Sequence, residues 1–362
     1  MAYTTIDNPG LYFNTKLYTG NGTAIGSGGQ AITGVGFQPD WVWIKDRTDS
    51  DRPRMFDAVR GVTKALDTSD TTAESTLSEG LTAFGSDGFT VGNHAGVNSS
   101  SDNFVAWNWL GANGTASNSN GSITSTVSAS ATSGFSIVSW TGSGSDATIG
   151  HGLSSAPEMY VVKNRSDSAD WRVGQTVSGN IMTGGNGYYM EWNDTKASSN
   201  PGSAVTWGST PTAPTASLFT VGSNNAHNGS SDNMIAYCFH SVKGYQKIGS
   251  FTGNGDNSGT FVYTGFAPAF VMVKKTSGTG NWGINDTKRD FNSTYGNDAS
   301  LYVNTSGAET TSSSLNIDLL SNGMKLRSNN SSYNASGGSY LYMAIAESPF
   351  VNSAGAVPTN AR

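Results

Sequence analysis

Short apolar runs separated by polar turns dominate the chain. Runs such as residues 41–44, 104–107 and 234–239 are rich in Val, Ile, Trp, Tyr and Phe, and clusters of Gly, Asn, Ser and Asp divide them. Strands bounded by turn residues at a spacing of about 8–12 residues are typical of a β-sandwich. The helical period of 3.6 residues is nearly absent. The pattern therefore predicts an all-β protein.

Four landmarks recur in the same order three times along the chain. An aromatic-Thr-Gly-x-Gly motif occupies 18–22, 140–144 and 251–255, and a proline-led apolar strand then ends at Lys45, Lys163 and Lys274. A third segment (88–92, 218–222 and 323–327) is followed by an apolar strand around an alanine, namely Ala106, Ala236 and Ala344. Recurrence at a steady spacing indicates a repeated structural unit. We predict three tandem antiparallel β-sandwich repeats of about 100–110 residues each.

The repeats set the expected domain boundaries. The three repeats should span 1–112, 134–243 and 244–350, with a Gly/Ser/Asn-rich linker at 113–133 that includes a possible short strand over 123–127. The tail 351–362 has no core candidates and is expected on the surface or on a partner subunit. Units of this size bury enough surface to be stable independently.

The strand after each proline is expected at the centre of its sheet. Trp41, Val42, Trp43 and Ile44 are apolar at consecutive positions. A strand that is apolar on both faces is covered on both faces. The lysine that ends each of these strands is expected to mark the point where the strand reaches water.

The charge and cysteine content exclude some classes of partner and an internal disulfide. The net charge is −6, charged residues make up 13% of the chain, and no run of Lys or Arg occurs. Nucleic acids and anionic membranes both need a concentrated basic surface, so neither is an expected partner, and we expect no membrane insertion. Cys238 is the single cysteine, so no disulfide forms within the chain. Residues 1–9 lack the basic and apolar regions of a secretory signal.

The sequence contains no recognisable catalytic or cofactor motif. A phosphate-binding loop, a zinc helix, a cysteine pair and a nucleophile elbow are all missing. Glycosidases use two carboxylates at a set separation, and Asp46, Asp49, Asp51 and Asp286 are the acids that such an enzyme would draw on. The 46–51 segment lacks the glycine and the distal glutamate of the familiar calcium loop, which favours a solvated turn. We expect no catalytic residue, no metal and no cofactor.

Several residues are candidates for ligand contact. His94 and His227 follow corresponding motifs and are expected at matching positions of the first two repeats, as solvated loop residues or as ligand contacts. Trp171 and Trp282 follow hydrophilic loops and are expected to be exposed. Asp46, with its neighbour Arg47, completes the set. The remaining strand tryptophans, at 41, 43, 107 and 109, are expected in the core, because aliphatic residues occupy several of the corresponding positions.

Several motifs together resemble a known family. These are the segments 37–47, 59–61, 86–92 and 105–109, with the weaker 150–153 and 346–350. They look like a repeated β domain of tail-fibre-like virion proteins of bacteriophages, and the similarity covers nearly the whole chain. The resemblance implies a lectin-like or jelly-roll-like sandwich in a phage appendage, and it implies no catalytic residues.

These observations lead to a prediction of function. We expect a phage virion structural protein that is made in the host cytoplasm and exposed on the particle surface. It would bind a host cell-surface glycan or receptor through multivalent loop contacts, assemble with other virion proteins, and form a homo-oligomer, with a trimer expected from the resemblance. Two alternatives stay open: a head (capsid) decoration or fibre protein without a receptor role, and a polysaccharide depolymerase.

Overall fold

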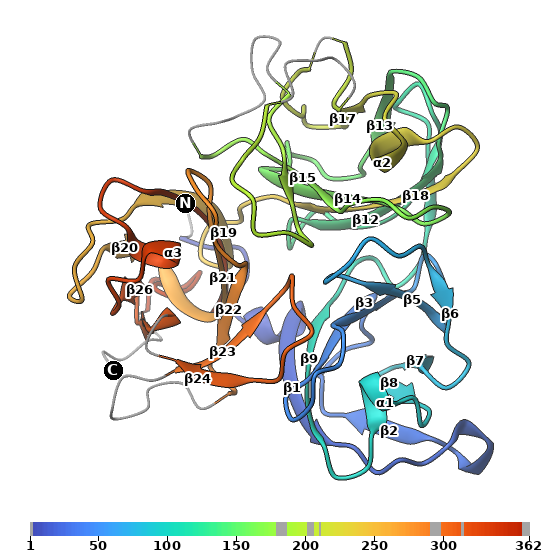
Figure 1. The fold of residues 1–362 in the computed structure, drawn as a ribbon, viewed down its shortest axis with the longest axis horizontal. Helices are drawn as coiled ribbons and strands as arrows, with labels where there is room; N and C mark the ends of the chain where they lie inside the picture. The colour runs from blue at the N-terminus through green and yellow to red at the C-terminus, as the bar shows by residue number, and fades with distance from the viewer. Residues whose placement is uncertain are drawn as a thin grey trace.

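The computed structural model describes residues 3–178, 187–200, 206–209, 211–289, 298–312 and 315–356. Antiparallel strands form most of this part of the chain, and three short α-helices and two 3-10 turns accompany them. The strands gather in three groups around a common centre (Figure 1). We call these groups the first, second and third units, containing β1–β9, β10–β18 and β19–β27 respectively.

The first unit pairs a large sheet with a small one. The large sheet has the order β1-β9-β3-β4-β5-β6, and the small sheet has the order β2-β8-β7. Its elements are η1 (Pro9–Leu11), β1 (Phe13–Thr19), η2 (Ile25–Ser27), β2 (Gln30–Thr33), β3 (Trp41–Asp46), β4 (Arg54–Asp57), β5 (Lys64–Asp67), β6 (Ser75–Thr76), β7 (Leu81–Gly85), β8 (Gly88–Val91), α1 (Ala95–Asn98) and β9 (Asn103–Trp109).

The second unit has two additional edge strands. Its large sheet has the order β10-β11-β12-β18-β14-β15-β16, and β13 pairs with β17 in the small sheet. The elements are β10 (Ala116–Asn118), β11 (Ser125–Ser130), β12 (Phe135–Thr141), β13 (Ala147–Gly150), β14 (Met159–Asn164), β15 (Arg172–Gln175), β16 (Met190–Glu191), β17 (Leu218–Val221), α2 (Asn225–Asn228) and β18 (Asn233–Phe239). The segment expected as a linker thus contributes β10 and β11, because β11 pairs along its length with β12.

The third unit returns to the pattern of the first. The large sheet has the order β19-β27-β21-β22-β23-β24, and the small sheet has the order β20-β26-β25. The elements are β19 (Gln246–Thr252), β20 (Phe261–Tyr263), β21 (Phe266–Lys275), β22 (Gly283–Asp286), β23 (Asp298–Tyr302), β24 (Thr310–Ser312), β25 (Ile317–Leu320), β26 (Gly323–Leu326), α3 (Ser331–Asn334) and β27 (Ser339–Pro349).

Corresponding strands follow the same order in the three large sheets. The opening strand lies beside the closing strand, which in turn lies beside the post-proline strand, in β1-β9-β3, β12-β18-β14 and β19-β27-β21. The strand register corrects the position of the third alanine landmark. Lys45 and Lys163 pair with the residues directly before Ala106 and Ala236. Lys274 pairs with Leu341, so Tyr342 is the corresponding residue and Ala344 lies two positions further along the strand. The all-β sandwich fold is confirmed. Descent of the three units from one copied template stays a prediction.

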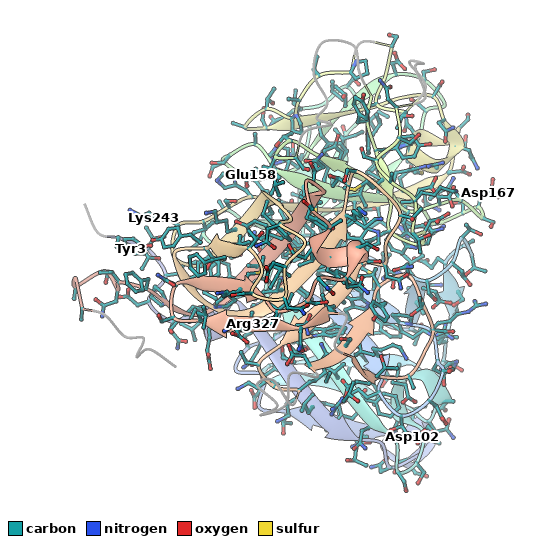
Figure 2. All side chains as sticks on the ribbon, turned by 60° about the vertical axis from the view of Figure 1, so that its left-hand side comes forward. Tyr3, Asp102, Glu158, Asp167, Lys243 and Arg327 are labelled. Carbon is teal, nitrogen blue, oxygen red and sulfur yellow. The ribbon has the colours of Figure 1, made fainter. Side chains whose placement is uncertain are left out.

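The large sheets share one core. Their facing sides contribute to a single cluster of buried residues drawn from all three units, which includes Trp41, Met159 and Phe270. Side chains fill the space between the sheets (Figure 2). The opposite side of each large sheet packs on its small sheet in a separate cluster. The expectation that each unit holds an independent core is therefore wrong for the inner faces, which no unit covers alone.

The strand tryptophans lie in this shared core, as predicted. Trp41, Trp43, Trp107 and Trp109 are each 1% exposed. The rings of Trp41 and Trp109 stack at 4.1 Å between centroids, and Trp41 also stacks on Tyr237 of the second unit. Every residue of β3 is buried, as expected for a central strand. No helix among the described residues has the length and apolar character needed to cross a membrane.

Candidate functional site

The predicted exposure of Trp171 and Trp282 is wrong, because both side chains are buried. The Trp171 Nε1 donates to the backbone oxygen of Asp67 in the first unit, at 2.8 Å. The Trp282 Nε1 donates in the same way to Glu191 O in the second unit, at 2.8 Å. A buried indole needs a partner for its N–H, and the preceding unit supplies one. Both tryptophans thus link neighbouring units through a hydrogen bond, and neither ring is available to a ligand.

The two histidines do not occupy matching positions. His94 is the N-cap of α1, and its Nδ1 accepts a hydrogen bond from Gly96 N. His227 lies inside α2, whose N-cap is Asn224. His227 is 1% exposed, and neither ring nitrogen has a hydrogen-bond partner within the described residues. Burial and the nearby Arg172 lower the pKa of His227 well below its usual value, so the ring is neutral.

Asp46 and Arg47 take part in contacts within the protein. The Asp46 carboxylate is buried and accepts hydrogen bonds from the backbone N–H groups of Thr48 and Asp49, which fixes the turn after β3. Arg47 pairs with Glu309 of the third unit through two nitrogens, at 3.0 and 2.7 Å. None of the six predicted contact residues lines either of the two pockets described below. Among the described residues, no group of three or more His, Cys, Asp or Glu side chains could hold a metal.

Each pair of neighbouring units is joined in the same way. We call these contacts the first joint (first to second unit), the second joint (second to third) and the third joint (third to first). At each joint, a backbone N–H donates across to the end of the next unit's post-proline strand, at 2.9 Å: Glu74 to Arg165, Ser198 to Thr276, and Glu309 to Arg47. The third joint closes the chain into a ring of three units.

Two joints contain a charged Arg-Glu-Arg network. Glu74 accepts hydrogen bonds from Arg165 and from Arg60 at the first joint. At the third joint, Glu309 lies between Arg47 and Arg289 in the same arrangement. Each inner arginine also pairs with an aspartate three residues before it, and both members of that pair are fully buried. Each aspartate accepts one more bond from the next unit, from Tyr237 or from the Trp107 indole.

Among the described residues, the second joint lacks this Arg-Glu-Arg network. Gln175 and Ser178 stand where the other joints have the Asp-Arg pair, and the Gln175 Oε1 accepts from Ser178 N. The Ser178 hydroxyl bonds the Thr276 hydroxyl, at 3.1 Å. Both charged residues are replaced at this joint, whereas replacement of only one would leave a buried charge without its partner.

The lysines that end the post-proline strands are buried, which contradicts the expected contact with water. Lys45, Lys163 and Lys274 are 1%, 0% and 0% exposed. Each ammonium donates to backbone oxygens. Lys163 reaches Thr71 O in the first unit, and Lys274 reaches Thr195 O in the second. Burial lowers the pKa of each lysine to about 8.

The aromatic-Thr-Gly-x-Gly motif has a structural role that sequence reasoning did not identify. The side-chain oxygen of a buried asparagine at the end of each short helix accepts a hydrogen bond from a backbone N–H of the motif. The pairs are Asn21 with Asn98, Ser143 with Asn228, and Asn254 with Asn334. The first glycine of each motif is required because a Cβ there would lie 2.1–2.4 Å from a backbone oxygen. The available signal was an asparagine 77–85 residues after each motif residue that bonds it.

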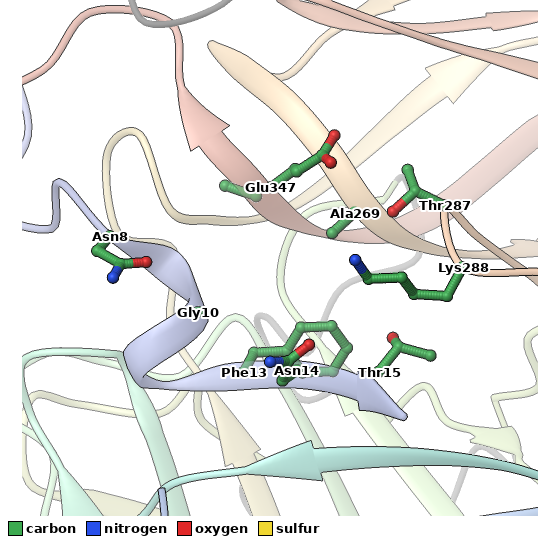
Figure 3. Close-up of a pocket in the computed structure, with 10 residues that line it drawn as sticks. Asn8, Gly10, Phe13, Asn14, Thr15, Ala269, Thr287, Lys288 and Glu347 are labelled. Carbon is green, nitrogen blue, oxygen red and sulfur yellow. The ribbon is translucent and has the colours of Figure 1, made fainter. Parts of the chain in front are cut away.

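A pocket of about 190 Å³ lies at the third joint. The start of β1, including Phe13 and Asn14, forms one wall, and Ala269, Lys288 and Glu347 of the third unit form the other (Figure 3). The Lys288 side chain extends into the space between the two walls.

Lysine at position 288 is specific to this joint. Lys288 lies between Asp286 and the ion-paired Arg289, and the corresponding residues of the other units are Val59 and Val177. Both valines pack against the shared core. A polar group therefore replaces an apolar contact at the joint that contains the pocket.

A second pocket, of about 270 Å³, lies in the outer layer of the second unit. Asp146, Thr148, Ser209 and Trp207 line it. Trp207 is 0% exposed and donates to Tyr188 O, so its ring offers no open stacking surface. Asp146 already accepts from Ser209 N. Each of the two pockets is lined by one carboxylate, Glu347 or Asp146.

A family model described as a domain of unknown function, DUF7483, matches residues 8–349. The chain belongs to this family. The match runs from η1 to the end of β27, so the unit that defines the DUF7483 family contains all three large sheets and all three joints. No curated protein matches the chain.

Proposed function

We propose that the chain is a structural and adhesive protein of a bacteriophage particle, tail-fibre-like, which contacts a host-surface glycan or neighbouring virion proteins. The observation that carries this proposal is the closed ring. Three sheets meet at one core through their inner faces, and the small sheets and their loops lie on the outside (Figure 1). Such an arrangement is a rigid display scaffold.

Fixed spacing favours binding through several weak contacts. Linked sites raise apparent affinity by about 10²–10⁴ when the geometry permits simultaneous contact. The joints hold the units in one relative arrangement, so little ordering remains to be done on binding. Homo-oligomerisation is a further part of the proposal. The solution mass tests it, and the expected result is the mass of three chains.

The placement of the carboxylates favours adhesion over hydrolysis. Asp286 is fully buried in its pair with Arg289, and Asp46 fixes a turn. Neither described pocket is lined by two carboxylates, whereas both glycosidase geometries need a pair about 5–10 Å apart. We therefore prefer a binding protein to a depolymerase.

Labelling of intact particles tests the proposal. Gold-conjugated antibodies raised against the purified chain should decorate the tail appendages in electron micrographs of phage particles. Particles that lack the protein serve as the control. Gold confined to the head shell would replace the adhesive role with head decoration, and unlabelled particles would overturn the virion assignment.

A further inference from the structure

The outer sheet of the third unit exposes two adjacent aromatic rings. Phe261 and Tyr263 are 45% and 50% exposed, and the residue between them, Val262, is buried. Side chains two positions apart on a strand point to the same face. The other exposed large apolar residues among those described, Leu11, Ile25 and Val62, lie in the first unit. The two rings therefore form the one pair of such residues on a single strand in the described part of the chain.

Comparison with the first unit shows that the fold does not require these rings. Phe261 and Tyr263 lie opposite Lys325 and Gly323. In the first unit, the residues in the same places are Ala31 and Thr33, opposite Thr90 and Gly88.

The difference in side-chain size continues on the neighbouring strand β25, and the second unit also has small residues at these positions. Asp318 and Leu320 of β25 correspond to Ala83 and Gly85 of β7. In the second unit, Thr148 and Gly150 take the places of the two aromatic residues. Small side chains thus stand at the positions of Phe261 and Tyr263 in both other units, so the small sheet forms without the two aromatic rings.

Hydrogen-bonding groups lie close to the Tyr263 ring. The Tyr3 hydroxyl lies 3.4 Å from the Tyr263 hydroxyl and donates to Gly265 O at 2.8 Å. The Lys243 ammonium lies 4.4 Å from the centre of the Tyr3 ring, and Figure 2 shows the two side chains next to each other at the molecular edge. Lys247 lies 5.5 Å from the Tyr263 ring. We call the surface made by Phe261, Tyr263, Tyr3 and Lys325 the aromatic face.

We propose that the aromatic face binds the sugar rings of a polysaccharide. Exposed aromatic rings stack on the C–H face of a sugar, and the nearby hydroxyl and ammonium groups can bond its hydroxyl oxygens. This inference rests on the proposed adhesive function and assigns one of its glycan contacts to the third unit.

The size of the face favours a sugar over a protein partner. Two aromatic side chains of about 200 Å² each, exposed by about half, present roughly 200 Å² of ring surface. A stable protein interface needs about 800 Å² from each partner. One or two sugar rings match the smaller area.

Affinity electrophoresis tests the proposal with the full chain. The protein is run through native gels that contain a neutral glucan, a galactomannan or a polyuronate. The test variant is Phe261→Thr with Tyr263→Thr, because the corresponding residues Thr148 and Thr33 already occupy these places in the other units. Ile25→Ala is the control for loss of an exposed apolar side chain elsewhere, and thermal melting checks that each variant is folded.

We expect at least one polysaccharide to retard the wild-type chain. The double variant should bind that polysaccharide at least about tenfold more weakly. The Ile25→Ala variant should be retarded like the wild type. Absence of retardation in all three gels, unchanged binding by the double variant, or equal loss in the control would each overturn the inference. Particle labelling is independent of the electrophoresis. Loss of the sugar-binding inference would leave the virion assignment standing, and unlabelled particles would leave the sugar-binding inference standing.

Discussion

Replacement of Glu74 by glutamine removes the central charge of the first joint. The Glu74 carboxylate accepts from Arg165 at 2.8 and 3.0 Å and from Arg60 at 3.2 Å. The side chain of Arg60 is 0% exposed and that of Glu74 is 13% exposed. The substitution leaves two arginines facing a neutral amide, with Asp57 as the remaining acidic partner of Arg60.

The expected cost follows from these contacts. Hydrogen bonds to charged groups contribute about 1.5–3 kcal/mol each, and loss of one partner from a buried ion pair costs about 3–5 kcal/mol. The partial exposure of Arg165 and the acceptor oxygen that glutamine keeps both reduce this figure. We therefore expect Glu74→Gln to lower the free energy of unfolding by about 3 kcal/mol at pH 7.

Urea unfolding measures this loss, and the second joint supplies the matched control. Ser198 holds the place of Glu74 there and bridges the units through its backbone N–H. The Ser198→Ala variant should stay within about 0.5 kcal/mol of the wild type.

The pH dependence gives a second test of the same charge. Burial alone would raise the pKa of Glu74, but its two arginine partners lower it below its usual value. The stabilisation is therefore complete above about pH 4.5 and is lost as the pH falls through the lower folded-state pKa. The difference between wild type and Glu74→Gln should shrink in that range. Equal effects of Glu74→Gln and Ser198→Ala at pH 7, or a difference that does not change in acid, would refute the reasoning.

Three other predictions concern the buried lysines, Trp282 and Lys288. The buried lysines have a folded-state pKa of about 8, below their usual value, so the unfolded chain binds more protons between about pH 8 and 10. The free energy of unfolding in urea should rise between pH 7.5 and 9 by about 1 kcal/mol per lysine. Lys163→Met should remove about a third of this rise, and a free energy of unfolding that does not change with pH would contradict the prediction. Trp282→Phe deprives Glu191 O of its donor and should cost about 1–2 kcal/mol in the same assay, whereas a loss below about 0.3 kcal/mol would show that the bond contributes little. Lys288→Val introduces the residue found at the other joints and should raise the melting temperature, because the valine can pack against the shared core; a lowered melting temperature would contradict this.

Local pattern was sufficient to predict the all-β fold and the central strand after each proline. Consecutive apolar residues at 41–44 indicated a strand covered on both faces, and β3 lies between β9 and β4 with every residue buried. The tryptophans of β3 and β9 are predicted in the core because the corresponding positions of the other repeats include aliphatic residues, and all four are buried.

Contacts between units could not be predicted from local pattern. A lysine after an apolar strand normally reaches water, yet Lys163 and Lys274 meet backbone oxygens that a neighbouring unit supplies. Trp171 and Trp282 follow polar loops, but those loops lie in the joints. Sequence spacing does not reveal which unit covers which surface.

The aromatic face was missed for a different reason. Phe261-Val262-Tyr263 is a run of three residues, too short to distinguish from core filler by its period. The available signal was the contrast with the outer strands of the other units, Gln30–Thr33 and Ala147–Gly150, which have small or polar residues on the exposed side. That contrast becomes informative once the register aligns the three small sheets.

Differential scanning calorimetry tests most directly whether the three units form one ring with a shared core. If they do, the whole chain of 362 residues unfolds in one transition, with an enthalpy of about 250 kcal/mol near 60 °C that equals the van't Hoff value. Two or three separate transitions, each with a fraction of that enthalpy, would contradict the account.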